Sequence, residues 1–307
     1  MDDSTEGDTA VLYLGLLAPT LITLIAGLVI HSFIIGVNVS DWWKERSVTP
    51  VDHIVTSLGI SRMCAQCANT LLFLMNMFPL SSPDFNVTLV IIGLVYNLFS
   101  DANIWLTSLL SIVFCLKISN FHTRLFLYLR GLIVHRTVFF IGAAVLLSAV
   151  NNLITLLLAI TENSSDETYN ATTECININS IYHATITVFF LFLFSCISSV
   201  LLFTSLYHHI TKMKMSRNLT VNLETYYSAL KLVFFTFLYN TLYVIIYIAA
   251  AIFYYFYCLN LLCFLIVLDF LPVLHSSYLI YRTAKLRSQM SKSCCVEKKD
   301  LSRPAPS

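Results

Sequence analysis

Three ionisable side chains lie inside long apolar stretches of the chain, where an isolated charge is costly. Asp101 and Asp269 each stand among hydrophobic residues, and Arg62 stands in a third such stretch. Since an unpaired carboxylate in a lipid interior costs several kcal/mol, acids of this kind face a wet cavity or a bonding partner. We expect at least one of them, with Asp269 favoured, to be a counter-ion for a cationic small molecule. The alternative for Asp101 is a protonated carboxyl, or one bonded to amides of the second or the last apolar stretch.

Arg62 and the residues around Pro272 are candidates for a conformational switch. At 1.5 Å of rise per helical residue, Arg62 lies about 12 Å inside its apolar stretch, so its guanidinium must be hydrogen-bonded. Pro272 interrupts the helical hydrogen bonds of the last stretch and can act as a hinge. His275 follows shortly after it. This histidine is either a side chain that changes partners or an ordinary structural residue.

The composition shows which elements must position these side chains. Hydrophobic residues make up 57% of the 307 residues, charged residues make up 11%, and the mean hydropathy is +0.77. Soluble domains carry about 25% charged residues, so the surplus apolar surface of this chain needs lipid as its solvent. The first nine residues are acidic where a signal peptide has a basic leader, and no cleaved targeting segment is expected.

Seven stretches are long enough to cross a bilayer core of about 30 Å as helices. They run over residues 10–37, 54–78, 88–116, 138–160, 181–207, 227–257 and 261–281. Short polar connections separate them, so every stretch has a sequence neighbour to pack against. The prediction is an all-α membrane protein with a seven-helix bundle over residues 10–282. An outer segment, 1–9, precedes the bundle and a cytoplasmic tail, 283–307, follows it.

Charge is distributed unevenly across the predicted bundle. All 18 lysines and arginines fall on one side of it, and the loops of the other side carry acids. Because cytosolic loops keep positive charge, the amino terminus is predicted to lie outside the cell and the tail inside, in the plasma membrane. Asn163-Ser-Ser and Asn170-Ala-Thr fall on the predicted outer side, so both are candidate glycosylation sites, with Asn170 favoured.

Five sequence blocks lie at the predicted inner ends of the helices. They are IGVNVSDWWKERSVTPVDHIVTSLGISR (35–62), IWLTSLLSIVFCLKISNF (104–121), LLFTSLYHHITKM (201–213), SALKLVFFTFLY (228–239) and LPVLHSSYLIYRTAKLR (271–287). In this order and at these places the chain resembles the taste receptor type 2 family of G-protein-coupled receptors. Trp105, Leu116, Lys117 and Asn120 match the helix 3 signature of that family.

The resemblance implies a receptor that binds small bitter compounds from the extracellular side. It also implies a heterotrimeric G protein as partner, containing gustducin or another inhibitory-type α subunit. The positions aligned with or near ligand contacts are Tyr96, Asn97, Ser100, Tyr243, Tyr247, Leu265 and Asp269. Tyr96 and Ser100 are four residues apart and share a helix face, as do Tyr243 and Tyr247. For each tyrosine the alternative is packing between helices, with its hydroxyl bonded to a neighbour.

The chain departs from the family pattern at several of these positions. His31 and Ser100 stand where the family has Asn, Tyr226 stands where it has His, and Leu265 stands where a polar or acidic residue is frequent. We therefore expect the fold of the family, with a ligand pocket that differs from its commonest form.

The resemblance also assigns residues to activation and coupling. Arg62 is expected to tie helices 1, 2 and 7 together, either as a contact that changes on activation or as a structural clamp. A basic inner rim is expected to dock the G protein, or to serve membrane topology alone. The rim comprises Lys117, His122, Arg124, His209, Lys212, Lys214, Lys231 and Lys285. Cys294 and Cys295 lie beside tail lysines and are candidates for palmitoylation.

Other classes of protein fit the sequence less well. A rhodopsin-like receptor would have a basic triplet at the end of helix 3, where this chain has Phe114-Cys115-Leu116-Lys117. A transporter would show repeated halves with broken helices. Motifs for an enzyme are absent, and no cofactor or metal is expected. A vomeronasal type 1 receptor is the nearest alternative, and an oligomer is left open.

Overall fold

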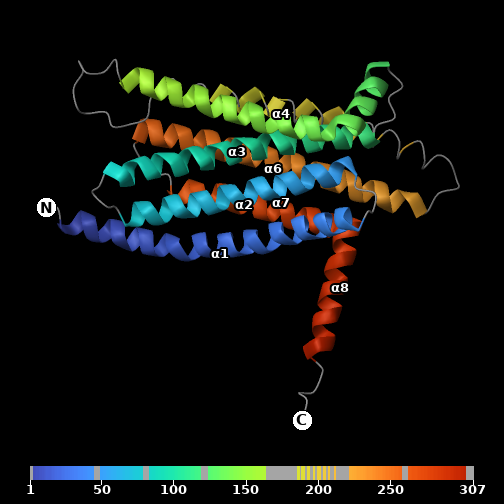
Figure 1. The fold of residues 1–307 in the computed structure, drawn as a ribbon, viewed down its shortest axis with the longest axis horizontal. Helices are drawn as coiled ribbons and strands as arrows, with labels where there is room; N and C mark the ends of the chain where they lie inside the picture. Colours follow the sequence, from blue (N-terminus) through green and yellow to red (C-terminus); the bar gives the residue numbers. More distant parts are fainter. Residues whose placement is uncertain are drawn as a thin grey trace, which may run out of the picture.

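The computed structural model describes residues 3–44, 49–78, 83–118, 124–163, 221–257 and 262–301, with scattered helical residues between 185 and 211. Within this part of the chain every element is an α-helix (Figure 1). The helices are α1 (Asp3–Trp43), α2 (Pro50–Met77), α3 (Pro83–Ile118), α4 (Arg124–Asn163), α6 (Val221–Tyr257), α7 (Leu262–Arg282) and α8 (Ala284–Leu301). All but α8 run roughly along one axis, and α8 leaves the bundle steeply (Figure 1).

Among the described residues, 5 helical segments are long and apolar enough to cross a membrane. They are Gly15–Trp43, Val87–Phe114, His135–Leu158, Leu230–Ala250 and Phe264–Arg282. Large apolar side chains such as Ile22, Val29 and Phe139 point outward, which suits a bundle whose solvent is lipid. The prediction of an all-helical membrane bundle is therefore confirmed.

Two of the seven predicted spans are not among these segments. The stretch 54–78 corresponds to α2, which is long enough at 28 residues but carries polar side chains on its buried face. Arg62, Gln66 and Asn69 lie on that face and make α2 less apolar than the five segments named above. The stretch 181–207 lies largely outside the described residues. Seven spans therefore stay a prediction.

The ends of several helices differ from the predicted boundaries. α1 begins at Asp3, inside the segment predicted as a separate outer terminus, and α8 lies within the predicted tail. α4 bends at Arg136, whose φ of -123° and ψ of 27° are not helical, close to where its apolar span begins. Apolar periodicity does not reveal such helix extensions, because their polar turns resemble loops in the sequence.

The start of α2 is set by a capping box. The Thr49 hydroxyl accepts a hydrogen bond from the Asp52 main-chain N–H at 3.3 Å, and the Asp52 carboxylate accepts one from the Thr49 N–H at 2.9 Å. Pro50 occupies the first helical turn, where its missing N–H costs nothing. These local contacts place the first turn of α2 next to the end of α1.

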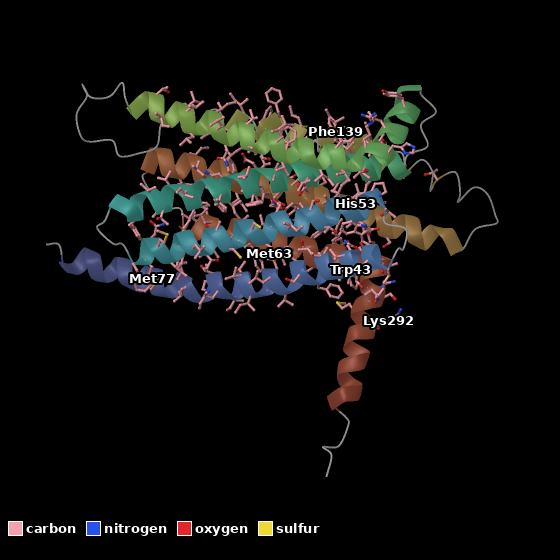
Figure 2. The ribbon with its side chains drawn as sticks, in the orientation of Figure 1. Trp43, His53, Met63, Met77, Phe139 and Lys292 are labelled. Carbon is pink, nitrogen blue, oxygen red and sulfur yellow. The ribbon has the colours of Figure 1, made fainter. Side chains whose placement is uncertain are left out.

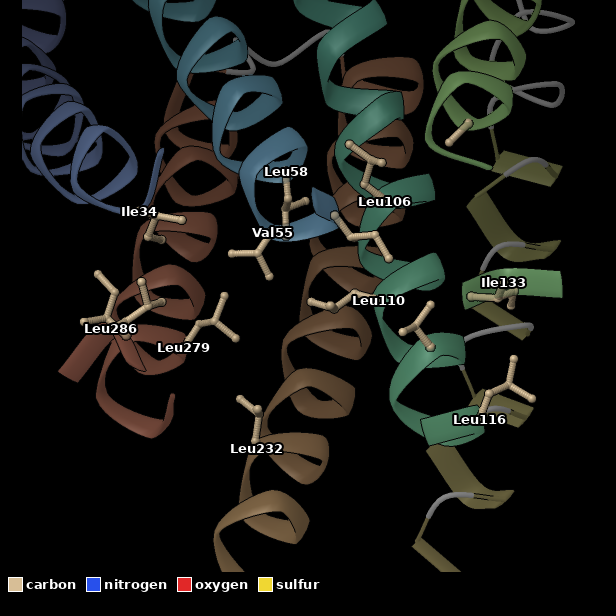
Figure 3. Packing of buried hydrophobic residues seen from close by; sticks show 14 residues of the cluster. Ile34, Val55, Leu58, Leu106, Leu110, Leu116, Ile133, Leu232, Leu279 and Leu286 are labelled. Carbon is tan, nitrogen blue, oxygen red and sulfur yellow. The ribbon is translucent and has the colours of Figure 1, made fainter. Parts of the chain in front are cut away.

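The apolar core lies toward the end of the bundle from which α8 leaves. α2 packs between α1 and α3 and also contacts α7. Ile34, Val55, Leu58, Leu110 and Leu279 fill the space between these helices, and Leu232 of α6 joins them (Figure 3). Trp43, His53 and Lys292 mark this end, whereas Met77 marks the opposite end (Figure 2). The polar side chains of α2 lie on the same helix, one to four turns beyond this apolar layer.

A close contact between α1 and α2 leads to a first prediction. A Cβ atom placed on Gly27 would overlap the side-chain amide of Gln66, whereas one on Gly36 of the same helix would meet nothing within 4 Å. Gly-to-Ala in a helix interior normally stabilises by about 1 kcal/mol, and overpacking costs about 1–3 kcal/mol. We expect Gly36→Ala to raise, and Gly27→Ala to lower, the thermal unfolding midpoint of the chain purified in detergent. Equal midpoints for the two variants would contradict the contact.

Candidate functional site

Arg62 lies at the centre of a buried polar network that joins four helices. Only 1% of its surface is exposed. Its guanidinium donates hydrogen bonds to neutral oxygens and contacts one imidazole nitrogen. The partners are Asn103 Oδ1 (2.8 Å) on α3, Tyr239 OH (3.4 Å) on α6, and Pro272 O (3.3 Å), Ser276 Oγ (2.6 Å) and His275 Nδ1 (3.1 Å) on α7.

This arrangement differs from the expected tie between helices 1, 2 and 7. The hydrogen bonds of Arg62 reach α3, α6 and α7, because the face of α2 that carries Arg62 is turned toward these helices. Asn103 also donates to the Tyr239 hydroxyl at 3.3 Å, which closes a ring of three side chains. The expectation that Arg62 is hydrogen-bonded is confirmed, and its partners include one on α6.

The hydrogen-bond partners of His275 determine its tautomer. Arg62 has only donors, so Nδ1 of His275 must accept from it at 3.1 Å. The Thr236 hydroxyl gives its own hydrogen to the Leu232 carbonyl at 2.9 Å, so it accepts from Nε2–H of His275 at 3.1 Å. His275 is therefore neutral, with its proton on Nε2, and its ring stacks on Tyr239 at 4.5 Å. The histidine links the guanidinium to α6.

The residues aligned with ligand contacts form a second group beyond this network. Ser100 Oγ and Tyr243 OH are 3.0 Å apart, which joins α3 to α6. Tyr96 hydrogen-bonds with Ser100 and is within electrostatic range of Tyr243 and Tyr247. Tyr243 and Tyr247 pack around Leu268 of α7 in a small apolar cluster. The structure thus brings the four predicted residues together.

Two of the other predicted contacts are placed less centrally. Asn97 is exposed on α3, on a different face from Tyr96 and Ser100, since one residue turns a helix by about 100°. Leu265 is half-buried in the first turn of α7. A cavity of about 10 Å³, just enough to hold one water, lies next to Tyr243 and Tyr239. Its lining is mostly apolar and comes from α3 and α6, with Phe192 at one side.

The two acids inside the bundle have different surroundings, and Asp269 is the more deeply buried. The Asp269 carboxylate on α7 accepts a hydrogen bond from the Asn69 amide, and its main-chain oxygen accepts one from Gln66 at 3.1 Å. The Asp101 carboxylate accepts one from Asn151 of α4 at 2.6 Å. The expected partners of Asp101 on the second or last stretch were wrong, because this side of α3 faces α4. The Asp269 carboxylate is also within electrostatic range of Tyr96.

Several residues of this site were not predicted from the sequence. They are Gln66, Asn69, Asn103, Thr236, Tyr239 and Ser276. One signal was present: Arg62, Gln66 and Asn69 recur at helical spacing within a mostly apolar segment, which indicates a polar helix face. Which residues of the other helices meet that face depends on how those helices are rotated.

The predicted rim and modification sites are only partly described. Lys231 is exposed on α6, and Lys285 contacts acids of α1 and α2. Lys117 and Arg124 lie at the end of α3 and the start of α4, and Asn163 ends α4. Cys294 and Cys295 lie on α8. Outside the described residues lie His122, His209, Lys212, Lys214 and Asn170.

The thiols of α2 do not form a metal site in the described part of the chain. Cys64 and Cys67 have Cys-X-X-Cys spacing and are half-buried free cysteines. No group of three or more His, Cys, Asp or Glu side chains among the described residues could hold a metal ion.

The apolar helices around a buried polar network define a multi-helix membrane protein with an internal site. A family model described as taste receptor protein (TAS2R) matches residues 10–298. The chain belongs to the taste receptor type 2 family, as its motifs predicted. The family model and the relatives that the chain matches are described as taste receptors.

Individual relatives are similar over parts of their length. Taste receptor type 2 member 117 of Rattus norvegicus is 32% identical over 52% of this chain and 49% of its own length. Member 7 of Rattus norvegicus is 30% identical over 62% of this chain and 64% of its own. Member 16 of Homo sapiens is 37% identical over 32% of each. The chain thus matches less than two thirds of the length of each of these relatives.

Proposed function

We propose that the chain is a bitter taste receptor of the plasma membrane with seven spans and an external amino terminus. Small bitter compounds bind from the extracellular side, and a heterotrimeric G protein of the gustducin type binds at the opposite end. Family membership, the apolar helices and the one-sided distribution of lysine and arginine support this proposal.

The ligand site in this proposal is the group around Tyr96, Ser100 and Tyr243. A bundle of helices provides a concave and mostly apolar cavity of the kind that small ligands occupy. Leu265, Tyr247 and Asp269 border it from α6 and α7, and Asp269 is the counter-ion for cationic compounds. Asn97 would contact ligand only at the margin, since it lies on an exposed face of α3.

One observation carries the coupling of this site to the inner end of the bundle. Tyr243 and Tyr239 lie one turn apart on α6, and Tyr243 bonds to Ser100 whereas Tyr239 bonds to Arg62. A ligand that competes for the Tyr243 hydroxyl therefore weakens one contact between α6 and α3, where Asn103 and Tyr239 form another. The Arg62–His275–Thr236 contacts hold α6 to α2 and α7, and their rearrangement around Pro272 would release α6.

The inner rim is the proposed surface for the G protein. Lys117, His122, Arg124, His209 and Lys231 belong to it, together with Lys212 and Lys214. Glycosylation at Asn163 and Asn170 and palmitoylation at Cys294 and Cys295 complete the proposal. The acylated cysteines would hold α8 against anionic lipid.

A cellular assay tests the proposed function. Cells that express the chain with a chimeric G protein α subunit are expected to release calcium when given at least one member of a panel of bitter compounds. Tyr243→Phe removes the bond to Ser100, and its concentration–response curve is expected to shift for that agonist. The matched control is Tyr281→Phe, since Tyr281 is exposed near the inner end of α7. Uptake of the compounds without calcium release would contradict the proposal and favour a transporter.

A further inference from the structure

Lys285 makes three contacts with α1 and α2 at the point where α8 begins. Its Nζ lies 3.1 Å from Asp41 Oδ2 and 3.2 Å from Asp52 Oδ1. It also donates a hydrogen bond to Asn38 Oδ1 at 3.1 Å. An ammonium group has three hydrogens and no acceptor, so these three oxygens use its full donor capacity. The contacts connect α8 to two helices that are distant from it in the sequence.

The oxygens that receive Lys285 are themselves held in position. Asn38 donates from Nδ2 to Thr56 Oγ1 at 3.0 Å, so its Oδ1 is the atom turned toward Lys285. Asp52 uses its other carboxylate oxygen to cap α2, where it accepts from the Thr49 N–H and hydroxyl, each at 2.9 Å. The acceptor site therefore exists because α1 ends and α2 begins at this place.

Partial burial distinguishes this cluster from an ordinary surface ion pair. The side chains of Asp41 and Asp52 are 11% and 15% exposed, and that of Lys285 is 29% exposed. Exposed pairs contribute little because water screens them and both side chains lose freedom. Here Asn38 and Asp52 are already fixed by other hydrogen bonds, and without Lys285 the carboxylates of Asp41 and Asp52 would repel each other where little water reaches them.

The described contacts connect the start of α8 to the bundle. Leu286 is buried in the apolar core next to Leu279 of α7. Met290 and the residues directly after it are exposed, as the helix leaves the bundle steeply (Figure 1). Lys285 and Leu286 therefore hold the first turn of α8 against the bundle.

We propose that Lys285 is a positioning residue that holds α8 against the ends of α1 and α2. Its three contacts, with Asn38, Asp41 and Asp52, are called the latch below. It acts within the chain and not as a docking cation of the inner rim. The latch sets the direction of α8 and so determines where Cys294 and Cys295 lie relative to the bundle. Since it joins α8 to α1 and α2, it does so whether or not the chain couples to a G protein.

A distance measurement tests the latch on the full chain in lipid nanodiscs. Spin labels are attached through non-natural amino acids at the exposed positions Ile60 on α2 and Met290 on α8. The parent chain is expected to give one narrow distance distribution, and Lys285→Met is expected to shift and broaden it. Lys285→Arg, which keeps the charge, should retain the narrow peak. Lys292→Met removes an exposed lysine of the same helix and should leave the distribution unchanged.

A second variant and a signalling measurement separate the latch from the alternatives. Asp41→Asn is expected to broaden the same distance distribution. Adding Lys285→Met to the Asp41→Asn chain should broaden it further by less than Lys285→Met broadens that of the parent chain. An unchanged distance in Lys285→Met would overturn the proposal. Loss of G-protein activation with an unchanged distance would identify Lys285 as a docking residue instead, and equal broadening in Lys292→Met would overturn the latch as well.

Discussion

Replacing Arg62 with methionine is expected to destabilise the chain by about 3 kcal/mol and to abolish its response to agonists. The substitution keeps the apolar stem but leaves buried acceptors on Asn103, Tyr239 and Ser276 without their donor. It also removes the group that holds α6 and α7 to α2. The measurements are the thermal unfolding midpoint in detergent and the ligand-evoked calcium signal.

Two matched variants separate the charge of Arg62 from its geometry. Arg62→Lys keeps the charge but lacks the planar fork of the guanidinium, so it cannot reach α3, α6 and α7 at once. We expect it to be nearly as impaired as Arg62→Met. Lys231→Met removes an exposed cation from α6 and should leave the unfolding midpoint close to that of the parent chain. A parent-like midpoint and response in Arg62→Met would disprove the central role of the network.

Asp269→Asn is expected to raise the half-maximal concentration of cationic agonists by about tenfold or more, since a hydrogen bond to a charged group contributes about 1.5–3 kcal/mol. Responses to uncharged agonists should stay close to those of the parent chain. The new amide oxygen can still accept from Asn69, so the contact between α2 and α7 persists. The change therefore removes the charge and keeps the packing.

Asp101→Asn is the control for this prediction. Asp101 is also an acid within a membrane-spanning helix, but its carboxylate accepts a hydrogen bond from Asn151 on α4 rather than from an amide of α2. Its substitution should change the half-maximal concentrations of cationic and uncharged agonists to the same extent, or leave both unchanged. If Asp269→Asn leaves the response to amines unchanged, the carboxylate is structural and the counter-ion hypothesis fails.

The membrane helices, the orientation and the family can be predicted from the sequence because each depends on many residues that lie near one another along the chain. Apolar runs of about 20 residues predict membrane helices, and the one-sided charge predicts an orientation, which stays a prediction. The motifs between residues 35 and 287 indicated the family, and the match over residues 10–298 confirms it. The resemblance assigned both Ser100 and Tyr243 to ligand contacts; their hydroxyls lie 3.0 Å apart, and their role in ligand binding stays a prediction.

Local patterns were less reliable where a polar segment could be helix or loop. The sequence predicted a tail over residues 283–307 without assigning it a helix, and α8 extends from Ala284 to Leu301. Lys285 was assigned to a docking rim from its charge and position alone. In the structure its amine is surrounded by Asn38, Asp41 and Asp52, which precede it in the sequence by more than 200 residues.

The sequence by itself determined that the chain is a helical membrane protein of the taste receptor type 2 family and that Arg62 must be bonded inside it. Only the tertiary structure decided that Arg62 reaches α6 through Tyr239, that Asp101 turns to α4, and that Lys285 turns to α1 and α2. Helix formation and membrane insertion depend on residues near one another in the chain. The partners of a buried polar group depend on the rotation and packing of whole helices, which no single stretch of sequence specifies.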